Sequence, residues 1–221
     1  MSPLPSCFKP ETIEDFVGDA GRIGRLLISK LKRAGDAPLK WVLCGPPGCG
    51  KSTLADFMAM HMAQNKLAIE VLNGQSCDIE RVREWTKATA YRAMFGERVV
   101  KIVNEIDKAS DAASNELRSY LDNLPNGYAF IGTSNLSPGK ADGKERTLQF
   151  QLQRRLFCYE FGVPTARELS LWIQTKWHDR PELDWDTVHG IVTANECCIA
   201  SSLIDVESVM DAAQLSQPIA A

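Results

Sequence analysis

GPPGCGKST, at residues 45–53, follows the apolar run Trp41–Cys44 and precedes residues 54–58 (LADFM), which contain no helix breaker. The pattern G-x-x-x-x-G-K-[ST] between a strand and a helix is typical of a loop that binds nucleoside triphosphates. Glycines let backbone N–H groups close around phosphate oxygens, and the N-terminus of the next helix adds its positive dipole end. A glycine-rich turn that binds nothing is the alternative, but it leaves the full pattern unexplained.

Residues of this loop have distinct expected roles. We expect Lys51 to reach the β- and γ-phosphates, Ser52 to place its hydroxyl on Mg²⁺, and Thr53 to help start the helix. The predicted nucleotide-binding residues of the loop are Gly45, Pro46, Pro47, Gly48, Cys49, Gly50, Lys51, Ser52 and Thr53.

The composition is that of a globular chain. Its 221 residues suit one or two domains, and 44% of them are hydrophobic, which is enough to bury a core. The first eight residues contain neither a signal peptide nor a run that could span a bilayer, so we expect a cytoplasmic protein without a membrane partner. Seven cysteines include no CxxC pair, which favours reduced thiols over disulfides or zinc.

The net charge of −3 hides an uneven distribution. From Asp179 onward there are eight acidic residues and one basic residue, so the rest of the chain is mildly basic. A nucleic-acid backbone could bind the two segments that concentrate this positive charge, although a solvated surface also explains such runs. These segments contain Arg81, Arg83, Lys87, Arg92, Arg98 and Lys101, and then Lys140, Lys144, Arg146, Arg154 and Arg155.

Strands and helices alternate along the chain. Apolar runs predict strands at 41–44, 67–72, 99–103, 128–133 and 157–161, and apolar stripes at helical spacing predict helices at 23–32, 52–65, 79–92 and 109–124. This alternation predicts an α/β fold in which helices cover both faces of a parallel sheet, giving three layers.

Polar side chains follow two of these strands. Asn104 and Glu105 follow strand 99–103, where phosphate-loop proteins place the Mg²⁺ partner and the residue that activates water. Glu105 is therefore the candidate general base. Asn104 is neutral and offers Mg²⁺ a weaker carbonyl oxygen, which makes impaired hydrolysis one expectation. Asn135 follows strand 128–133, at the edge where open α/β sheets bind ligands. A surface turn that leaves Glu105 without a role is the alternative.

The order of phosphate loop, Glu105, Asn135 and paired arginines resembles an AAA+ ATPase, and it is most similar to clamp-loader small subunits of the replication factor C type. The resemblance covers roughly residues 8–178. It implies the AAA+ form of the three-layer parallel sheet, followed by a small helical lid. We therefore expect a nucleotide-binding domain at 1–162 and a lid domain at 163–221, with lid helices at 165–177, 185–194 and 202–214.

The resemblance also implies further site residues. Residues 8–10 (FKP) and 15–18 (DFVG) resemble the family's N-terminal box, which places Val17 and Gly18 near the adenine base. Residues 152–156 (LQRRL) resemble the segment that supplies an arginine finger, with Arg155 in the arginine's position and Arg154 in place of a serine. Asn135 matches the sensor that positions the attacking water.

A DNA contact is implied in the same way. Residues 70–73 (EVLN) and the helix that follows them resemble the clamp-loader helix that turns toward DNA. Arg83 and Lys87 of this helix are the predicted DNA-binding residues.

The resemblance implies an oligomeric ATPase. ATP and Mg²⁺ would lie between two like or unlike subunits, and hydrolysis would remodel a DNA replication or repair assembly with a sliding clamp or helicase as partner. A second interpretation is an ATP-binding, hydrolysis-deficient assembly subunit, motivated by Asn104 and by Glu207, which aligns with a second sensor arginine of the family. Helicase loading, branch migration and protein remodelling are other AAA+ roles that these motifs leave open. A small-molecule kinase is less favoured because nothing in the sequence indicates a second substrate pocket.

Overall fold

The computed structural model describes residues 8–89, 97–138 and 150–215. The chain divides into two compact units. One comprises Met1–Arg22, Pro47–Gly50 and Gly162–Ala221, and the other comprises Ile23–Pro46 and Lys51–Phe161. The proposed domains at 1–162 and 163–221 stay a prediction.

The second unit contains a parallel sheet of five strands in the order β2-β3-β4-β1-β5. The strands are β1 (Leu39–Cys44), β2 (Ile69–Asn73), β3 (Val99–Asn104), β4 (Tyr128–Ser134) and β5 (Phe157–Glu160). Every residue of β4 is buried because this strand lies at the centre of the sheet. Parallel pairing brings the carboxyl ends of all five strands to one edge, where the predicted catalytic residues follow β3 and β4.

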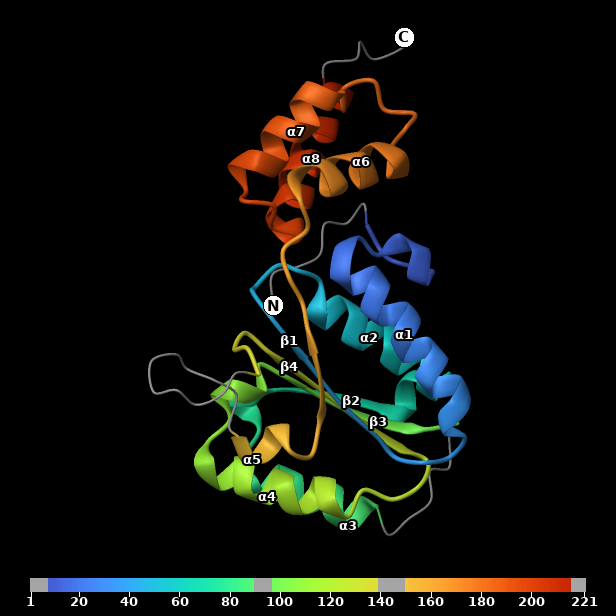
Figure 1. The fold of residues 1–221 in the computed structure, drawn as a ribbon, viewed down its shortest axis with the longest axis vertical. Coiled ribbons are helices and arrows are strands. Elements are labelled where there is room, and N and C mark those ends of the chain that lie inside the picture. The colour runs from blue at the N-terminus through green and yellow to red at the C-terminus, as the bar shows by residue number, and fades with distance from the viewer. Residues whose placement is uncertain (1–7, 90–96, 139–149, 216–221) are drawn as a thin grey trace. The chain divides into compact units, whose positions relative to one another are not determined.

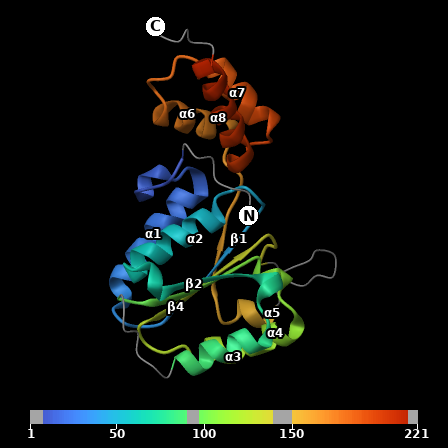
Figure 2. The ribbon, with the colours of Figure 1, turned by 180° about the vertical axis from the view of Figure 1, so that it is seen from behind.

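Helices cover both faces of this sheet, as Figures 1 and 2 show. On one face lie α1 (Gly18–Ala34) and α2 (Lys51–Ala63), and on the other lie α3 (Ile79–Ala88), α4 (Asp111–Asp122) and the short α5 (Phe150–Gln153). Short 3₁₀ turns occupy Ile13–Asp15, Lys66–Ala68, Gly74–Ser76 and Ile106–Lys108. The predicted α/β fold with three layers is confirmed.

Aromatic side chains fill the core between the sheet and the α3–α4 layer. The Tyr120 ring lies 5.7 Å from the Trp85 ring and 6.5 Å from the Phe130 ring, measured between centroids. All three side chains are buried. Large rings bury much apolar area each, so this cluster fixes the layer that carries α4 and α5 against the sheet.

The first unit contains the three lid helices α6 (Ala166–Lys176), α7 (Trp185–Ala194) and α8 (Ile199–Leu215). Two of them begin at side-chain caps, because Thr165 accepts a hydrogen bond from Glu168 N and Asp184 accepts one from Thr187 N. Their apolar faces form one core that includes Val17. The expected helical lid is therefore present.

An ion pair ties the N-terminal segment to the lid within this unit. Burial raises the pKa of the Asp15 carboxyl, but the Lys176 ammonium and the backbone N–H groups of Thr12 and Glu11 lower it more, to about 2. Asp15 is therefore ionised throughout the neutral range, which keeps residues 11–15 joined to α6.

Candidate functional site

Three glycines of the loop between β1 and α2 have positive φ angles, +145° at Gly45, +75° at Gly48 and +86° at Gly50. Side chains other than glycine are strained at such angles. At Gly45 a Cβ atom would also lie 2.4 Å from the Phe161 carbonyl oxygen. The loop therefore requires glycine at these three positions. Its conformation is of the kind in which backbone N–H groups can surround a phosphate.

Lys51 is the first residue of α2, and its side chain is directed back along the loop. Its ammonium donates hydrogen bonds to the carbonyl oxygens of Gly45, at 2.8 Å, and Pro46, at 2.6 Å. Lys51 is only 6% exposed, so its positive charge is largely shielded from solvent. Ser52 and Thr53 follow in the first turn of α2, where backbone N–H groups face outward from the helix end. This combination of ammonium, helix N-terminus and glycine backbone fits a triphosphate.

Glu105 lies at the carboxyl end of β3 in a left-handed conformation, with φ 54° and ψ 50°. Its Oε1 accepts a hydrogen bond from the Asn135 amide at 3.3 Å, while its Oε2 accepts from Lys108 Nζ at 3.0 Å and from Asn73 Nδ2 at 3.5 Å. The hydrogen bond from the Lys108 ammonium is the main reason that the pKa of Glu105 is lowered. The strand ends of β2, β3 and β4 therefore meet at one carboxylate.

Asn104 is 4% exposed and belongs to a second network beside Glu105. Thr133 Oγ1 donates to Asn104 Oδ1 at 3.2 Å and accepts from the backbone N–H of Glu105 at 3.1 Å. The Asn104 oxygen is thus a neutral ligand that is already hydrogen-bonded. Mg²⁺ prefers carboxylates and is held largely by phosphate oxygens in such sites. Hydroxyl and amide oxygens can also bind Mg²⁺, so the role of Ser52 and Asn104 as its ligands stays a prediction.

The remaining predicted site residues belong to other elements of the fold. Arg155 follows α5, and its Nε donates to Asp122 Oδ1 of α4 at 2.8 Å. Arg83 Nε lies 3.6 Å from Glu116 Oε1 of α4, and Lys87 is exposed in the last turn of α3. Val17 and Gly18 belong to the unit that holds the lid helices and loop residues 47–50. Their roles in binding a base, a neighbouring nucleotide or DNA stay predictions.

Comparison with known families identifies the fold's relatives. The family described as "ATPase family associated with various cellular activities (AAA)" matches residues 41–156, which is just over half of the chain. The chain belongs to the AAA ATPase family. The match runs from β1 through the phosphate loop and the ends of β3 and β4 to the residue after Arg155. It therefore covers the predicted catalytic residues.

Several known proteins are similar to this AAA ATPase over part of its length. It is 29% identical over 124 residues to replication factor C subunit 4 of Encephalitozoon cuniculi, covering 55% of this chain and 39% of that protein. It is 34% identical over 133 residues to the chromosome transmission fidelity protein 18 homolog of Xenopus laevis, covering 58% and 13%. It is 30% identical over 109 residues to ATPase WRNIP1 of Dictyostelium discoideum, covering 49% and 12%. The matched region thus spans well under half of each relative, and it makes the chain a relative of clamp-loader and replication-associated ATPases.

Among solved structures, a single-substitution variant of RuvB from Thermotoga maritima has the same fold. The TM-score is 0.59 at 20% identity, and the match covers 92% of this chain and 73% of that one. Within the described ranges, none of the helices combines the length and apolar content that crossing a bilayer requires.

Three contacts in the site were not predicted from the sequence. Lys108 follows Glu105 by three residues, a spacing at which side chains meet in a helical turn, and this spacing could have indicated the ion pair. Asn73 and Thr133 lie at the ends of strands that flank β3, and the sequence predicted no strand order that would have placed them beside Glu105.

Proposed function

We propose that this AAA ATPase binds ATP with Mg²⁺ at residues 45–53 and hydrolyses it slowly to remodel a DNA replication or repair assembly. The observation that carries the proposal is the meeting of Glu105 and Asn135 at 3.3 Å, at the strand ends beside the phosphate loop. A carboxylate and an amide side by side can take a proton from a water molecule and orient it for attack on a phosphate.

Each side chain has one part in this reaction. Lys51 balances the charge of the phosphates, while Ser52 and Asn104 complete the ligands of the Mg²⁺ that the nucleotide brings. Glu105 accepts the proton of the attacking water, and Asn135 positions that water. Arg155 of a neighbouring subunit would neutralise charge in the transition state, a contribution of roughly 10³ to 10⁵ in rate. A separate monomer is then a poor ATPase.

Steady-state ATP hydrolysis over a series of protein concentrations tests this proposal, with and without primed DNA. The rate per subunit should rise with concentration and with DNA, because Arg155 acts on the nucleotide of a neighbour. Arg155→Ala should remove the rise, whereas Arg154→Ala, one residue away, should retain it. A rate that is independent of concentration and of Arg155 would contradict action between subunits.

A second candidate function is an ATP-binding assembly subunit that does not hydrolyse. Asn104 favours it, because its side chain is neutral, buried and hydrogen-bonded to Thr133. Tight ATP binding combined with a near-zero rate at every concentration would support this candidate, and the search for a catalytic partner subunit would follow.

The proposed partners follow from the resemblance to clamp-loader small subunits. We infer that this chain acts in a homo- or hetero-oligomer on DNA, with a sliding clamp or a helicase, and the similarity to replication factor C subunit 4 supports this inference. Arg83 and Lys87 are the DNA contacts that the family resemblance proposes. Analytical ultracentrifugation with ADP and with a non-hydrolysable ATP analogue would show whether nucleotide drives assembly.

A further inference from the structure

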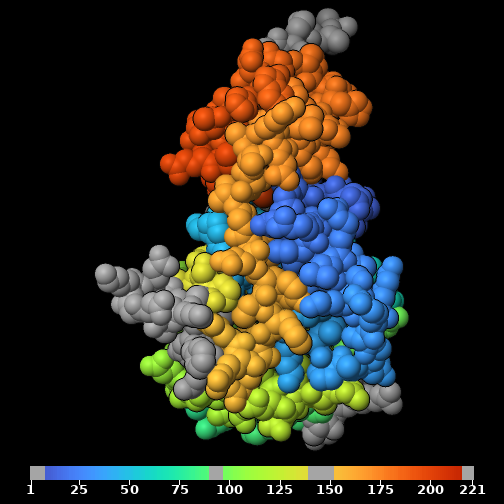
Figure 3. Space-filling model, viewed as in Figure 1, coloured from blue at the N-terminus to red at the C-terminus, as the bar shows by residue number. Residues whose placement is uncertain are grey.

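Arg155, the proposed contact with a neighbour's nucleotide, forms an ion pair with a carboxylate of its own chain. Its Nε donates a hydrogen bond to Asp122 Oδ1 at 2.8 Å. Hydrogen bonds between charged groups are roughly twice as strong as those between neutral groups. The pKa of the Asp122 carboxyl is lowered, mainly by the hydrogen bond from Arg155, so the carboxyl is ionised at neutral pH. Figure 3 shows the segment that contains α5 and β5, in orange, at the surface beside the atoms of α4, in green.

Both residues of the pair belong to backbone that the core holds in place. Asp122 is the last residue of α4 and follows the buried Leu121. Arg155 lies between the buried Leu152 and Leu156, and its backbone N–H donates to the Leu152 carbonyl oxygen at 3.0 Å. These three leucines belong to one apolar cluster. Since both backbones are fixed by this cluster, the contact with Asp122 helps to set the direction of the Arg155 side chain.

The pair lies toward the other edge of the sheet from its own phosphate loop. Strand β5 runs parallel to β1, and its last residue, Glu160, is level with Cys44, after which the loop begins. Arg155 instead precedes Phe157, the first residue of β5. A parallel strand rises about 3.3 Å per residue, so the two ends of β5 lie about 10 Å apart along the sheet. This position suits an arginine that acts on the nucleotide of a neighbouring subunit.

Folding stability gives little reason for a carboxylate at this position. The last turn of a helix carries the negative end of the helix dipole, which disfavours an acidic side chain. The Asp122 side chain is 50% exposed and that of Arg155 is 31% exposed. Ion pairs between exposed side chains contribute little to stability. The effect of the contact on the Arg155 side chain therefore explains Asp122 better than a contribution to folding does.

We propose that Asp122 is a positioning residue that holds the Arg155 guanidinium in the direction from which it contacts the nucleotide of a neighbouring subunit. The inference rests on the proposed function, because it adds a second residue to the same contact between subunits. The hydrogen bond uses Nε, the guanidinium donor nearest the main chain. It therefore orients the plane of the group, whose terminal nitrogens reach farther out. Preorganisation of this kind lowers the entropy cost of a contact.

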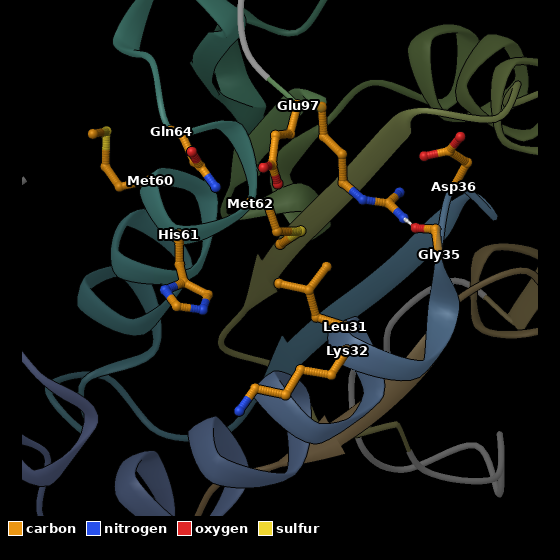
Figure 4. Close-up of a pocket in the computed structure, with 10 residues that line it drawn as sticks. Leu31, Lys32, Gly35, Asp36, Met60, His61, Met62, Gln64 and Glu97 are labelled. Carbon is orange, nitrogen blue, oxygen red and sulfur yellow. Dashed lines mark hydrogen bonds between the residues drawn. The ribbon is translucent and has the colours of Figure 1, made fainter.

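A hollow near the same edge of the sheet takes no part in this arrangement. It has a volume of about 650 Å³ and lies between the C-terminal ends of α1 and α2 (Figure 4). Its carboxylates, Asp36 and Glu97, interact electrostatically with the buried Arg98. Helices α1 and α2 cover the opposite face of the sheet from α4, so the hollow offers Arg155 no carboxylate.

A double-variant cycle tests the role of Asp122. It uses steady-state ATP hydrolysis at a protein concentration where the rate per subunit has levelled off. Asp122→Ala should lower kcat about 10- to 100-fold and leave KM unchanged, because a misplaced group weakens the transition state rather than ATP binding. In an Arg155→Ala background the same substitution should have no further effect, since no guanidinium remains to be positioned.

Two further variants separate positioning from a general loss of charge. Asp122→Glu should recover part of the loss, because it keeps the carboxylate and moves it by one methylene. Glu84→Ala is the matched control, since it removes the carboxylate of another exposed ion pair, with Arg81 at 2.9 Å. It should retain the kcat of the wild type. Circular dichroism checks the fold of each variant.

Mixed subunits place the same substitution on either side of the contact. A Lys51→Ala chain keeps Arg155 but loses a contact with ATP, whereas an Arg155→Ala chain keeps the loop but lacks the guanidinium. Their mixture should hydrolyse ATP faster than either chain alone. Asp122→Ala should remove this gain when it is in the Lys51→Ala chain and leave it when it is in the Arg155→Ala chain, because Asp122 acts through the Arg155 of its own chain.

Several results would overturn the inference. An unchanged kcat for Asp122→Ala would do so, and a raised kcat would show that Asp122 withholds Arg155 instead. A further fall in the Arg155→Ala background, or equal losses from both placements in the mixture, would give Asp122 a structural role in α4. If the mixed chains do not assemble, the double-variant cycle decides alone. A wild-type rate that does not depend on Arg155 would refute action between subunits in the proposed function, and the role of Asp122 with it.

Discussion

The phosphate loop and the strand ends beside it differ in the charges that their side chains carry and in how these charges are paired. In the loop, the Lys51 ammonium is buried and is surrounded by backbone groups. At the strand ends, the position next to Glu105 is the neutral Asn104, and Glu105 itself is paired with Lys108. One region thus has a buried positive charge, while the other has a neutral side chain beside a carboxylate that is paired with a cation.

From this difference we infer that ATP binding and ATP hydrolysis depend on separate groups in this chain. Under the proposed function, binding requires the loop backbone, Lys51 and the start of α2. Hydrolysis would require a carboxylate, Glu105, whose two oxygens accept hydrogen bonds from Asn135, Lys108 and Asn73. Variants that change one region should therefore leave the property of the other unchanged.

The largest expected effect is on the loop. Lys51→Ala should weaken ATP binding by roughly 10- to 100-fold, since a hydrogen bond to a charged group contributes about 1.5–3 kcal/mol. Isothermal titration calorimetry would measure it. Lys108→Ala removes a lysine from the strand ends and should keep the affinity of the wild type; an equal loss there would contradict the separation of the two regions.

The second effect concerns the backbone of the loop. Gly45→Ala should lower the free energy of unfolding by about 2–3 kcal/mol, because a Cβ at φ +145° would meet the Phe161 carbonyl oxygen at 2.4 Å. Gly127→Ala is the matched control, since Gly127 also has a positive φ, +79°, but no atom lies within 4 Å of the added carbon. It should cost only about 1 kcal/mol. Urea denaturation would measure both, and equal losses would show that contact with Phe161 is unimportant.

The third expected effect comes from introducing a negative charge at the strand ends. Asn104→Asp should raise hydrolysis about tenfold or more, because a carboxylate is a better Mg²⁺ ligand than an amide. Asn73→Asp places the same charge on the neighbouring strand, in register with Asn104, and should give no gain. Initial rates of phosphate release would compare the two. No gain from Asn104→Asp would mean that groups other than Asn104 limit the reaction.

The smallest expected effect comes from removing the Lys108 ammonium that pairs with Glu105. In an Asn104→Asp background, Lys108→Met should raise hydrolysis about two- to fivefold, since Glu105 becomes a stronger base without the ammonium at 3.0 Å. Lys87→Met, an exposed lysine on α3, should leave the rate unchanged. A fall in rate for Lys108→Met would show instead that Lys108 orients Glu105 productively.

Much of this arrangement could be predicted from sequence because periodicity and glycine pattern are local. The loop, the strand preceding Asn104 and helix α7 (Trp185–Ala194) follow directly from such patterns. The start of α1 was predicted at residue 23 but lies at Gly18, since glycines in the first two turns weaken the helical pattern. The four-residue α5 is too short to show a period.

Contacts between side chains were harder to predict. The sequence predicted a strand from Leu67, but Leu67 lies in a 3₁₀ turn because the Asn65 side chain accepts a hydrogen bond from its backbone N–H. The contacts of Glu105 with Asn73 and Lys108 depend on strand order and on the turn after β3, which one sequence does not specify. The Asp122 partner of Arg155 likewise comes from a helix 33 residues away in sequence.

The most direct test of the central claim measures binding and hydrolysis on one sample of the wild-type chain. Mg²⁺–ATP is titrated by calorimetry, and the bound nucleotide is then recovered and separated by chromatography at increasing times. The account predicts saturable binding that Lys51→Ala weakens, with the bound nucleotide remaining ATP much longer than in Asn104→Asp. Absent binding, or conversion to ADP as fast as in Asn104→Asp, would contradict it.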